Sequence, residues 1–117
     1  MIEGMLKPGQ TLIARNMQSA AVIEDMLGEG GQAEVYRARI GSAHYALKWY
    51  RPEYLAGDRR LWERLKVAIN SGSPTEQFLW PFDLVSHPRS QEYGGYLMPI
   101  KKDQAPPDLR YFKQAPK

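Results

Sequence analysis

The sequence predicts a small α+β domain, in which an N-terminal arm precedes a five-stranded antiparallel sheet with one helix after its third strand. Two observations predict this fold class. Glycine and proline interrupt the chain at short intervals, as is typical of short strands joined by turns. One stretch alone repeats its apolar residues at helical spacing. With 117 residues, of which 43% are hydrophobic, the chain can bury one core but not two substantial ones.

The first half of the chain predicts an arm and three strands. The arm covers residues 1–20 and includes Thr11–Ala14, which is a weak strand or an extended segment. From Glu34 to Ile40 the side chains alternate with a period of two, which favours a half-exposed strand with Val35, Arg37 and Arg39 on one face and Glu34, Tyr36 and Ala38 on the other. Pro52 ends the third expected strand, which precedes it, because proline cannot continue a hydrogen-bonded ladder. The three expected strands are Ala21–Leu27, Glu34–Ile40 and His44–Tyr50.

The second half predicts one helix and two further strands. The helix runs from Asp58 to Asn70, with Asp58 as its N-cap and Gly72 as part of its stop signal. The residues that define the helical pattern are Leu61, Trp62, Leu65, Ala68 and Ile69. The two strands are Phe78–Val85 and Gly95–Met98, joined by a polar loop.

Composition excludes several classes of function. The net charge of +3 comes from 16 basic and 13 acidic residues that are interleaved along the chain, so no basic block indicates a nucleic-acid partner. The chain has no cysteine, and its only imidazoles are His44 and His87, so we expect no metal site in these residues. No apolar stretch reaches the ~20 residues that span a bilayer, and the N-terminus does not resemble a secretion signal. These features predict a cytoplasmic protein without a membrane partner.

The segment from Leu27 to Val35 is a glycine-rich turn between two apolar runs, and Lys48 follows on the second strand after it. Glycines allow backbone N–H groups to approach a phosphate closely, and a lysine supplies the cation that phosphates need. The combination indicates a nucleotide phosphate clamp. The alternative is an ordinary hairpin whose flanking Leu27 and Val35 only pack into a core.

Strand alternation predicts which way Lys48 points. It puts Lys48 on the same face as Ala46 and Tyr50. The opposite face carries Tyr45, Leu47 and Trp49. One face can then pack into a core while the other lines a cleft. The alternative is a surface lysine that extends its ammonium group into solvent.

The glycine-rich turn, Lys48, the helix and the last strand occur in an order known from protein kinases. The kinase pattern G-x-G-x-x-G-x-V is matched by Gly28, Gly30 and Val35, with Ala33 in the place of the third glycine. The chain therefore resembles the ATP-binding N-terminal lobe of bacterial serine/threonine protein kinases of the eukaryotic type. Ala33 would be strained only if its φ were positive.

The resemblance covers about Ile23–Lys101 and implies a lobe at residues 21–101, followed by a post-hinge tail at residues 102–117. It implies that ATP with Mg²⁺ is the cofactor and that a protein is the substrate of the full-length kinase. The residues that it assigns to ATP are Leu27, Gly28, Glu29, Gly30, Gly31, Gln32, Ala33, Val35, Ala46, Lys48, Met98, Pro99 and Lys101.

Within this set the resemblance implies separate roles. Leu27 and Val35 would form an apolar roof over adenine, and Ala46 would lie against the base. Lys48 would hold the α and β phosphates. The backbone N–H groups of the glycine-rich turn would cover the phosphates.

The hinge would lie between Met98 and Lys101, with Met98 as the gatekeeper. Pro99 would offer its carbonyl to adenine, so its missing N–H would cost nothing, and Lys101 would supply the N–H donor. An edge strand that ends at a proline is the alternative, and both interpretations can hold together.

A phosphate-binding lysine needs a carboxylate that fixes it, and the resemblance makes Lys48 and Glu63 a catalytic pair. Glu63 is the only acidic residue of the predicted helix after its first turn. The alternative is an exposed helical glutamate beside Arg59, Arg60 and Lys66. The register of the helix decides between the two.

Two motifs of a working kinase are absent from these residues. The sequence has neither H-R-D-x-x-x-x-N nor D-F-G, so the chain alone lacks a catalytic base and Mg²⁺ ligands and should not phosphorylate a substrate. Two functions remain: the ATP-binding lobe of a kinase that continues past Lys117, or a free-standing inactive module that binds a partner. An unrelated small β domain is a third interpretation. An apolar surface around the helix and the last strands would favour self-association.

Overall fold

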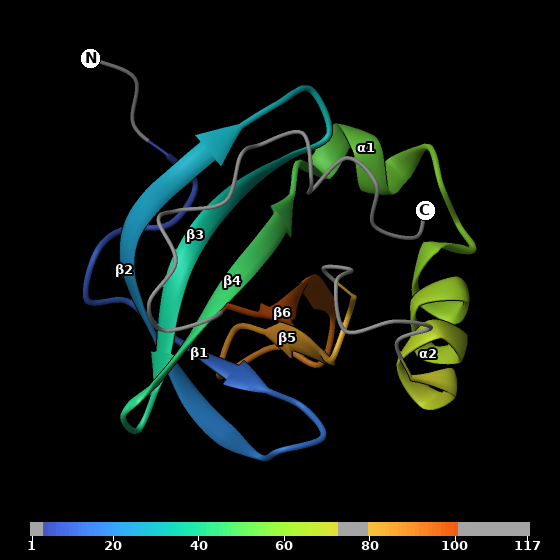
Figure 1. Ribbon diagram of the computed structural model, residues 1–117. Helices are drawn as coiled ribbons and strands as arrows, with labels where there is room; N and C mark the ends of the chain where they lie inside the picture. Colours follow the sequence, from blue (N-terminus) through green and yellow to red (C-terminus); the bar gives the residue numbers. More distant parts are fainter. Residues whose placement is uncertain (1–3, 73–79, 101–117) are drawn as a thin grey trace.

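The computed structural model describes residues 4–72 and 80–100, in which six antiparallel strands close into a barrel with two helices beside it (Figure 1). Neighbouring strands follow the order β1-β2-β3-β4-β6-β5, and β5 pairs back onto β1. The strands are β1 (Thr11–Ala14), β2 (Ser19–Glu29), β3 (Ala33–Ile40), β4 (Ala43–Tyr50), β5 (Asp83–Ser86) and β6 (Tyr93–Pro99). The helices are α1 (Pro52–Ala56) and α2 (Leu61–Ser71).

The predicted fold class is wrong in its central feature, because the sheet is a closed barrel rather than an open sheet. The expected arm contains β1, in which Ile13 and Ala14 pair with Ser86 and Val85 of β5. On its other side β1 pairs with β2. Leu12 and Ala14 are fully buried, so the burial of apolar surface stabilises the closure. The described sheet therefore has six strands instead of five.

The prediction of one helix is also wrong, because α1 lies between β4 and α2. Pro52 stands at the start of α1, and Glu53 lies in its first turn. Proline suits this position because the first turn of a helix leaves its N–H groups without intrahelical partners. Pro52 thus ends β4, as predicted, and also begins a helix that the prediction lacked.

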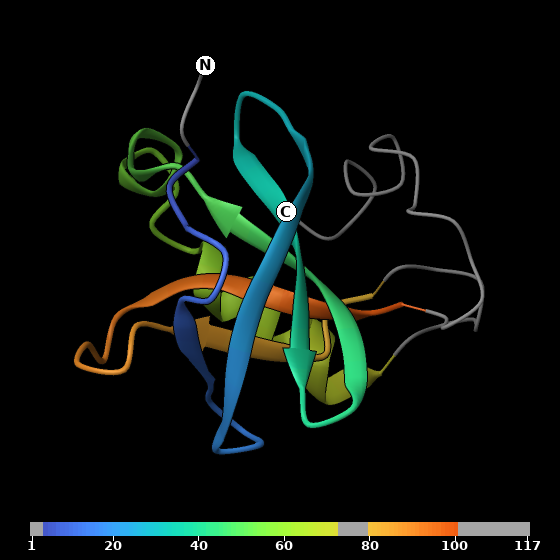
Figure 2. The ribbon, with the colours of Figure 1, turned by 90° about the vertical axis from the view of Figure 1, so that its left-hand side faces the viewer.

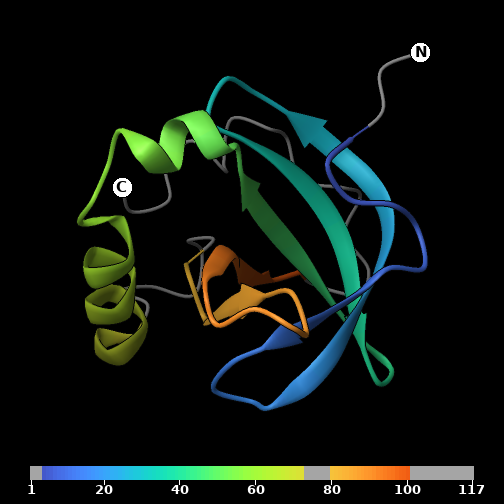
Figure 3. The same ribbon diagram turned by 180° about the vertical axis from the view of Figure 1, so that it is seen from behind.

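α2 covers one outer side of the barrel, next to β5 and β6 (Figures 1 and 3). It ends as predicted, since Gly72 at its C-cap has a φ of 77°, which glycine adopts without strain. Its start differs from the prediction, because Asp58 does not cap the helix but accepts hydrogen bonds from the Arg64 guanidinium. The buried residues of α2 are Leu61, Leu65 and Ala68.

β2 is the longest strand, and it bends so that it can pair with β1 as well as with β3. Its pairing with β3 shifts register between Ile23 and Met26, and again between Met26 and Gly28. Such irregularities increase the local twist of a strand. Figure 2 shows the result: β5 and β6 run across the direction of β2 and β3.

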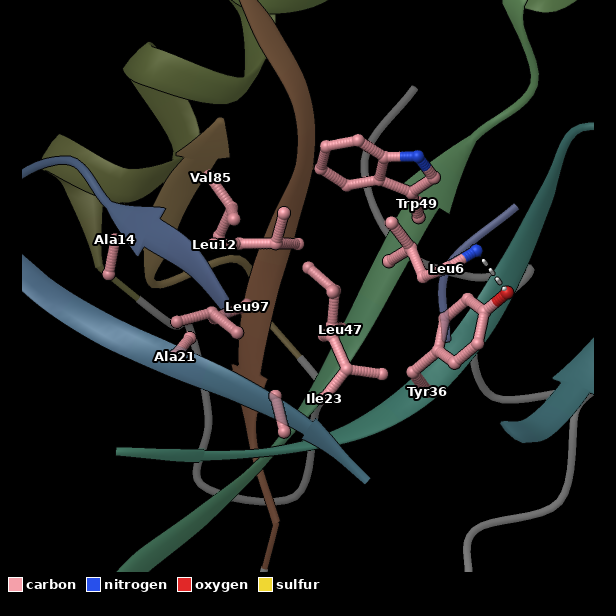
Figure 4. Close-up of a cluster of buried hydrophobic side chains, with 11 residues drawn as sticks. Leu6, Leu12, Ala14, Ala21, Ile23, Tyr36, Leu47, Trp49, Val85 and Leu97 are labelled. Atoms are coloured by element: carbon pink, nitrogen blue, oxygen red, sulfur yellow. Dashed lines mark hydrogen bonds between the residues drawn. The ribbon is translucent and has the colours of Figure 1, made fainter. Parts of the chain in front are cut away.

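The interior of the barrel holds the first of two apolar cores. Leu6, which precedes β1, lies among these side chains, and its N–H donates a hydrogen bond to the Tyr36 hydroxyl at 3.1 Å (Figure 4). The segment before β1 is thereby tied to β3. The buried residues of this barrel core are Leu6, Leu12, Ala14, Ala21, Ile23, Tyr36, Ala38, Leu47, Trp49, Val85 and Leu97.

The second core, the outer cluster, lies between α2 and the outside of the barrel. β3, β4, β5, β6 and α2 all contribute buried residues to it. Half-buried side chains such as Leu27 and Trp62 pack against it. Its buried residues are Ala33, Val35, Ala46, Tyr50, Leu61, Leu65, Leu84, Tyr96 and Met98.

The last part of the chain is described in part. β6 contains the predicted strand Gly95–Met98, and β5 contains the end of the predicted strand Phe78–Val85. Residues 73–79, Lys101 and the predicted tail at residues 102–117 lie outside the described residues. In the described ranges, neither helix is both long and apolar enough to span a bilayer.

Candidate functional site

Alternate side chains of β4 enter the two cores. Ala46 and Tyr50 belong to the outer cluster, whereas Leu47 and Trp49 belong to the barrel core. Lys48 therefore lies on the side of the outer cluster, as alternation predicts. Only 6% of Lys48 is exposed. The lysine is thus buried rather than extended into solvent.

A row of cross-strand neighbours passes through Lys48. Cross-strand partners lie side by side on one face, with roughly 5 Å between their Cβ positions. Gly28 pairs with Val35, Val35 with Lys48, Lys48 with Tyr96, and Tyr96 with Leu84. The row brings the glycine-rich segment and the lysine to the same face of the barrel.

The apolar residues that the sequence assigns to adenine meet on this face. Val35, Ala46 and Met98 are members of the outer cluster, and Leu27 packs against it. Ala46 and Met98 are also cross-strand partners. None of Val35, Ala46 and Met98 is more than 2% exposed, so this part of the face is packed rather than open. The expectation that this face lines a cleft therefore does not describe these three side chains.

Lys48 and Glu63 are not brought together. Glu63 is exposed on α2, and among the described residues there is no ion pair between it and Lys48. The ammonium group of Lys48 instead lies 5.2 Å from the centre of the Tyr50 ring, within the range of a cation–π interaction. The arrangement fits the alternative in which Glu63 is an exposed helical glutamate.

Two glycines of β6 allow close packing against β4. A Cβ at Gly95 would lie 2.1 Å from the carbonyl oxygen of Lys48, and one at Gly94 would lie 2.2 Å from the Trp49 ring. Neither distance is compatible with a side chain. Gly95 therefore permits the approach of β6 to the backbone of Lys48, and sequence analysis gave it no role.

The glycine-rich turn is a tight hairpin between β2 and β3. The Gly30 N–H donates a hydrogen bond to the Ala33 carbonyl at 2.9 Å. Neither Gly30 nor Gly31 has a positive φ, and a Cβ at either position would meet no heavy atom within 4 Å. Ala33 also has no positive φ, so its replacement of a glycine causes no backbone strain. The fold itself thus does not require glycine at positions 30 and 31.

Arg51 fixes this hairpin from the end of β4. Its backbone N–H donates to the Gln32 carbonyl at 2.8 Å, and its Nε donates to the Gly30 carbonyl at 3.0 Å. Its Nη1 lies 3.6 Å from the Glu34 carboxylate. Sequence analysis missed this role, because Arg51 stands between the expected strand His44–Tyr50 and Pro52 and belongs to no motif.

Glu34 is a buried carboxylate with several partners. It is 2% exposed, and its Oε1 accepts hydrogen bonds from the Met5 N–H at 2.7 Å and from the Tyr36 hydroxyl at 2.5 Å. Burial, together with the hydrogen bond to Glu34, raises the pKa of Tyr36 to about 12. Glu34 therefore joins the segment before β1, the barrel core and Arg51. Strand alternation alone gives no sign of such a partner set.

Aromatic side chains surround Lys48 on the side of the helices. The Tyr50 ring stacks on Tyr54 at 5.4 Å between ring centres and meets the edge of Trp62 at 5.8 Å. The centres of the Tyr96 and Tyr50 rings lie 6.1 Å apart. The buried hydroxyl of Tyr96 has no hydrogen bond with regular geometry. Burial raises the pKa of Tyr50 and of Tyr96 above the usual value of a phenol. Both rings therefore stay protonated at alkaline pH values at which an exposed phenol ionises.

The expected hinge is visible in part. Met98 is buried in β6, and Pro99 is exposed at the end of that strand, where it pairs with Tyr45. Lys101, the expected N–H donor to adenine, lies outside the described residues. The alternative of an edge strand that ends at Pro99 is wrong in one respect, because β6 lies between β4 and β5.

Within residues 4–72 and 80–100, no group of three or more acidic, histidine or cysteine side chains could hold a metal ion. Comparisons of the chain with protein-family models, with curated proteins and with solved structures found no match.

Proposed function

We propose that the chain binds ATP on the outer face of β2, β3, β4 and β6, and that it is the ATP-binding part of a serine/threonine protein kinase. The observation that carries the proposal is the row of Gly28, Val35 and Lys48, which lies beside Ala46 and Met98. An apolar cluster for the base, a cation for the phosphates and a glycine-rich backbone occur side by side. Kinase-type nucleotide sites combine these three elements.

The apolar part of the site would hold adenine after the cluster opens, because Val35, Ala46 and Met98 are at most 2% exposed. Leu27, Val35, Ala46 and Met98 come from four different strands and pack in one cluster. Ligand sites are mostly apolar, with a few polar groups that set the orientation. The pairing of Ala46 with Met98 puts the expected base contact beside the expected gatekeeper.

The glycine-rich hairpin would cover the phosphates. Open space lies in front of Gly30 and Gly31, because a Cβ there would meet no heavy atom within 4 Å. Glycines that neither a positive φ nor a crowded neighbour requires are consistent with an external group that approaches the backbone. This supports a role in ligand binding rather than in folding.

Lys48 would neutralise the α and β phosphates. At 6% exposure its ammonium group can meet a phosphate only after neighbouring groups move. We therefore expect ATP binding to change the surroundings of Lys48 and Tyr50. Burial also increases the strength of any charge–charge contact that forms there.

Phosphoryl transfer would require a second lobe. The 117 residues contain neither the catalytic loop nor the D-F-G motif, so both the base and the Mg²⁺ ligands would come from elsewhere. A cytoplasmic location, which supplies ATP, is part of the proposal. The free-standing inactive module remains the alternative. A reading frame that continues past Lys117 with both motifs supports the kinase, whereas a stop codon there supports the module.

Titration with Mg-ATP, followed by the amide chemical shifts of residues 28–35, tests the proposal. We expect shifts at millimolar nucleotide, and we expect Lys48→Met to weaken binding by about tenfold, or about 1.4 kcal/mol. The exposed Lys7 provides the control, and Lys7→Met should bind as the wild type does. Absence of shifts at millimolar ATP in the wild type would rule out the proposed site.

A further inference from the structure

The glycine-rich hairpin is held by a hydrogen bond of its own and by two from Arg51, the residue that follows β4. Within the hairpin, the Gly30 N–H bonds to the Ala33 carbonyl. The carbonyls of Gly30 and Gln32 are bonded by Arg51, one through its side chain and the other through its backbone. Two carbonyls on either side of Gly31 are therefore fixed to the same residue at the end of β4.

Arg51 is itself fixed by a buried carboxylate. Its Nη1 lies 3.6 Å from Glu34, which is 2% exposed, whereas the Arg51 side chain is 29% exposed. Glu34 is in turn held by the Met5 N–H and the Tyr36 hydroxyl. Removal of one partner from a buried, hydrogen-bonded charge is costly, so the pair constrains the orientation of the guanidinium. A planar guanidinium can serve the carbonyl and the carboxylate at the same time, which an ammonium group cannot do in the same geometry.

We propose that Arg51 is the positioning residue of the nucleotide site: it holds the carbonyls of the hairpin so that the N–H groups around Gly31 face a phosphate. The inference rests on the proposed function, because it assigns the hairpin to ATP. Arg51 would act through the hairpin and would not touch the nucleotide. Preorganised backbone N–H groups bind an anion more tightly than mobile ones, because less ordering entropy is lost on binding.

The hairpin between β3 and β4, at the opposite end of β3 from the glycine-rich turn, offers a matched control. Arg39 donates from its Nη1 to the Gly41 carbonyl at 3.0 Å, and its Nε lies 3.5 Å from Glu24. It thus makes the same two kinds of contact, to a turn carbonyl and to a carboxylate. Its hairpin lies at the other end of β3 and β4, away from the glycine-rich turn.

The test compares Arg51→Ala, Arg51→Lys and Arg39→Ala in two measurements. Amide hydrogen exchange of residues 29–33 without nucleotide reports how firmly the hairpin is held. Mg-ATP titration reports the dissociation constant, and thermal melting identifies any variant that does not fold. We expect Arg51→Ala to speed hairpin exchange and to weaken ATP binding by about tenfold, as loss of hydrogen bonds from a charged donor predicts. Arg51→Lys should be intermediate, and Arg39→Ala should change neither quantity.

Three results would overturn the inference. If Arg51→Ala loosens the hairpin but leaves the ATP affinity unchanged while Lys48→Met weakens it, the proposed function stands and the positioning role fails. If the hairpin exchanges at the wild-type rate in both Arg51 variants, Arg51 does not hold it. If the wild type does not bind ATP, the proposed function fails and the positioning role for a nucleotide fails with it, whereas the exchange rates still report whether Arg51 holds the hairpin. If Arg51→Ala does not fold, Arg51→Lys decides between these results.

Discussion

The structure explains why several positions are glycine, but it gives no such reason for Gly30 and Gly31. Gly41 and Gly72 have positive φ angles, and Gly95 lies against a neighbouring backbone. At positions 30 and 31 the backbone has no positive φ and the adjacent space is open. An alanine there can adopt the native backbone conformation. Residue type and local geometry therefore suggest a role outside the fold for these two positions.

This difference makes Gly31→Ala a test that separates folding from binding. The unfolded chain loses less entropy when alanine replaces glycine at a compatible position, so we expect the melting temperature to stay the same or rise, with a gain of at most about 1 kcal/mol. The added methyl group would occupy the space in front of the hairpin backbone. We expect ATP binding to weaken by about fivefold or more, or about 1 kcal/mol. A variant that binds ATP normally would contradict the role of the hairpin.

Single residues of the candidate site were predictable where a local pattern fixes them. Alternation along one strand is enough to place Lys48 opposite Leu47. Whether Ala33 is strained depends on its φ, which the sequence does not provide and which the structure shows not to be positive. The position of Glu63 depends on how α2 rotates against the barrel, which the sequence of the helix does not determine. The contacts of Arg51 with Gly30 cross from one strand end to another, so no short motif reports them.

At the level of elements, α2 shows how a helix is held against the barrel. Leu65 is fully buried in the outer cluster, whereas Val67, two residues later, is 65% exposed. The two side chains are similar in chemistry and differ in burial. The apolar stripe of the helix, rather than its intrinsic propensity, therefore provides the attachment to β5 and β6.

The two positions give a matched pair of truncations. Leu65→Ala should reduce the free energy of unfolding by about 2–5 kcal/mol, because it removes buried methyl groups and leaves a cavity. Val67→Ala should change it by less than about 0.5 kcal/mol, because the side chain is already in solvent. Urea unfolding followed by tryptophan fluorescence measures both. Equal losses in the two variants would show that α2 does not pack as described.

The features that the sequence did not predict are one short helix and one pairing between distant strands, β1 and β5. β1 has four residues, and its pairing with β5 joins segments that are separated by most of the described chain. No local pattern contains that pairing, so the sequence predicts Thr11–Ala14 only as a weak strand or an extended segment of the arm. α1 has five residues and begins at Pro52, a residue that also ends strands. The longer elements, β2, β3, β4 and α2, were predicted because their periodicity is repeated enough to be visible.

At the level of the whole molecule, buried tyrosines in both cores make the stability of the fold depend on pH. Tyr36 lies in the barrel core, and Tyr50 and Tyr96 lie in the outer cluster. All three have pKa values raised above 10 by burial. The folded state therefore keeps these phenols protonated at pH values where the unfolded chain would release the protons.

We expect the chain to lose stability between about pH 10 and pH 12. A raised pKa stabilises the fold fully below the unfolded value of 10.0, and for Tyr36 this contribution is lost as the pH rises to its folded value of about 12. For each such group, the free energy of unfolding falls by up to roughly 1.4 kcal/mol per pH unit in this range. Circular dichroism against pH, together with tyrosinate absorbance, measures the transition.

Tyr36→Phe provides the control for this pH dependence. The substitution removes the titrating group and the hydrogen bond to Glu34, so it should lower the free energy of unfolding by about 1 kcal/mol at neutral pH. Between pH 10 and 12 its stability should fall less steeply than that of the wild type. A wild-type stability that stays constant up to pH 12 would contradict the expected shift.

The two faces of β4 also have an evolutionary consequence. Leu47 and Trp49 fit the barrel core, whereas Ala46 and Lys48 lie on the side of the outer cluster, although the four residues are consecutive in the chain. Substitutions at neighbouring positions therefore meet different partners. As related sequences diverge, changes at 47 and 49 should be compensated inside the barrel, and changes at 46 and 48 should be compensated on β3, β6 or α2. Adjacent positions of this strand would thus evolve independently, and alternate positions would covary.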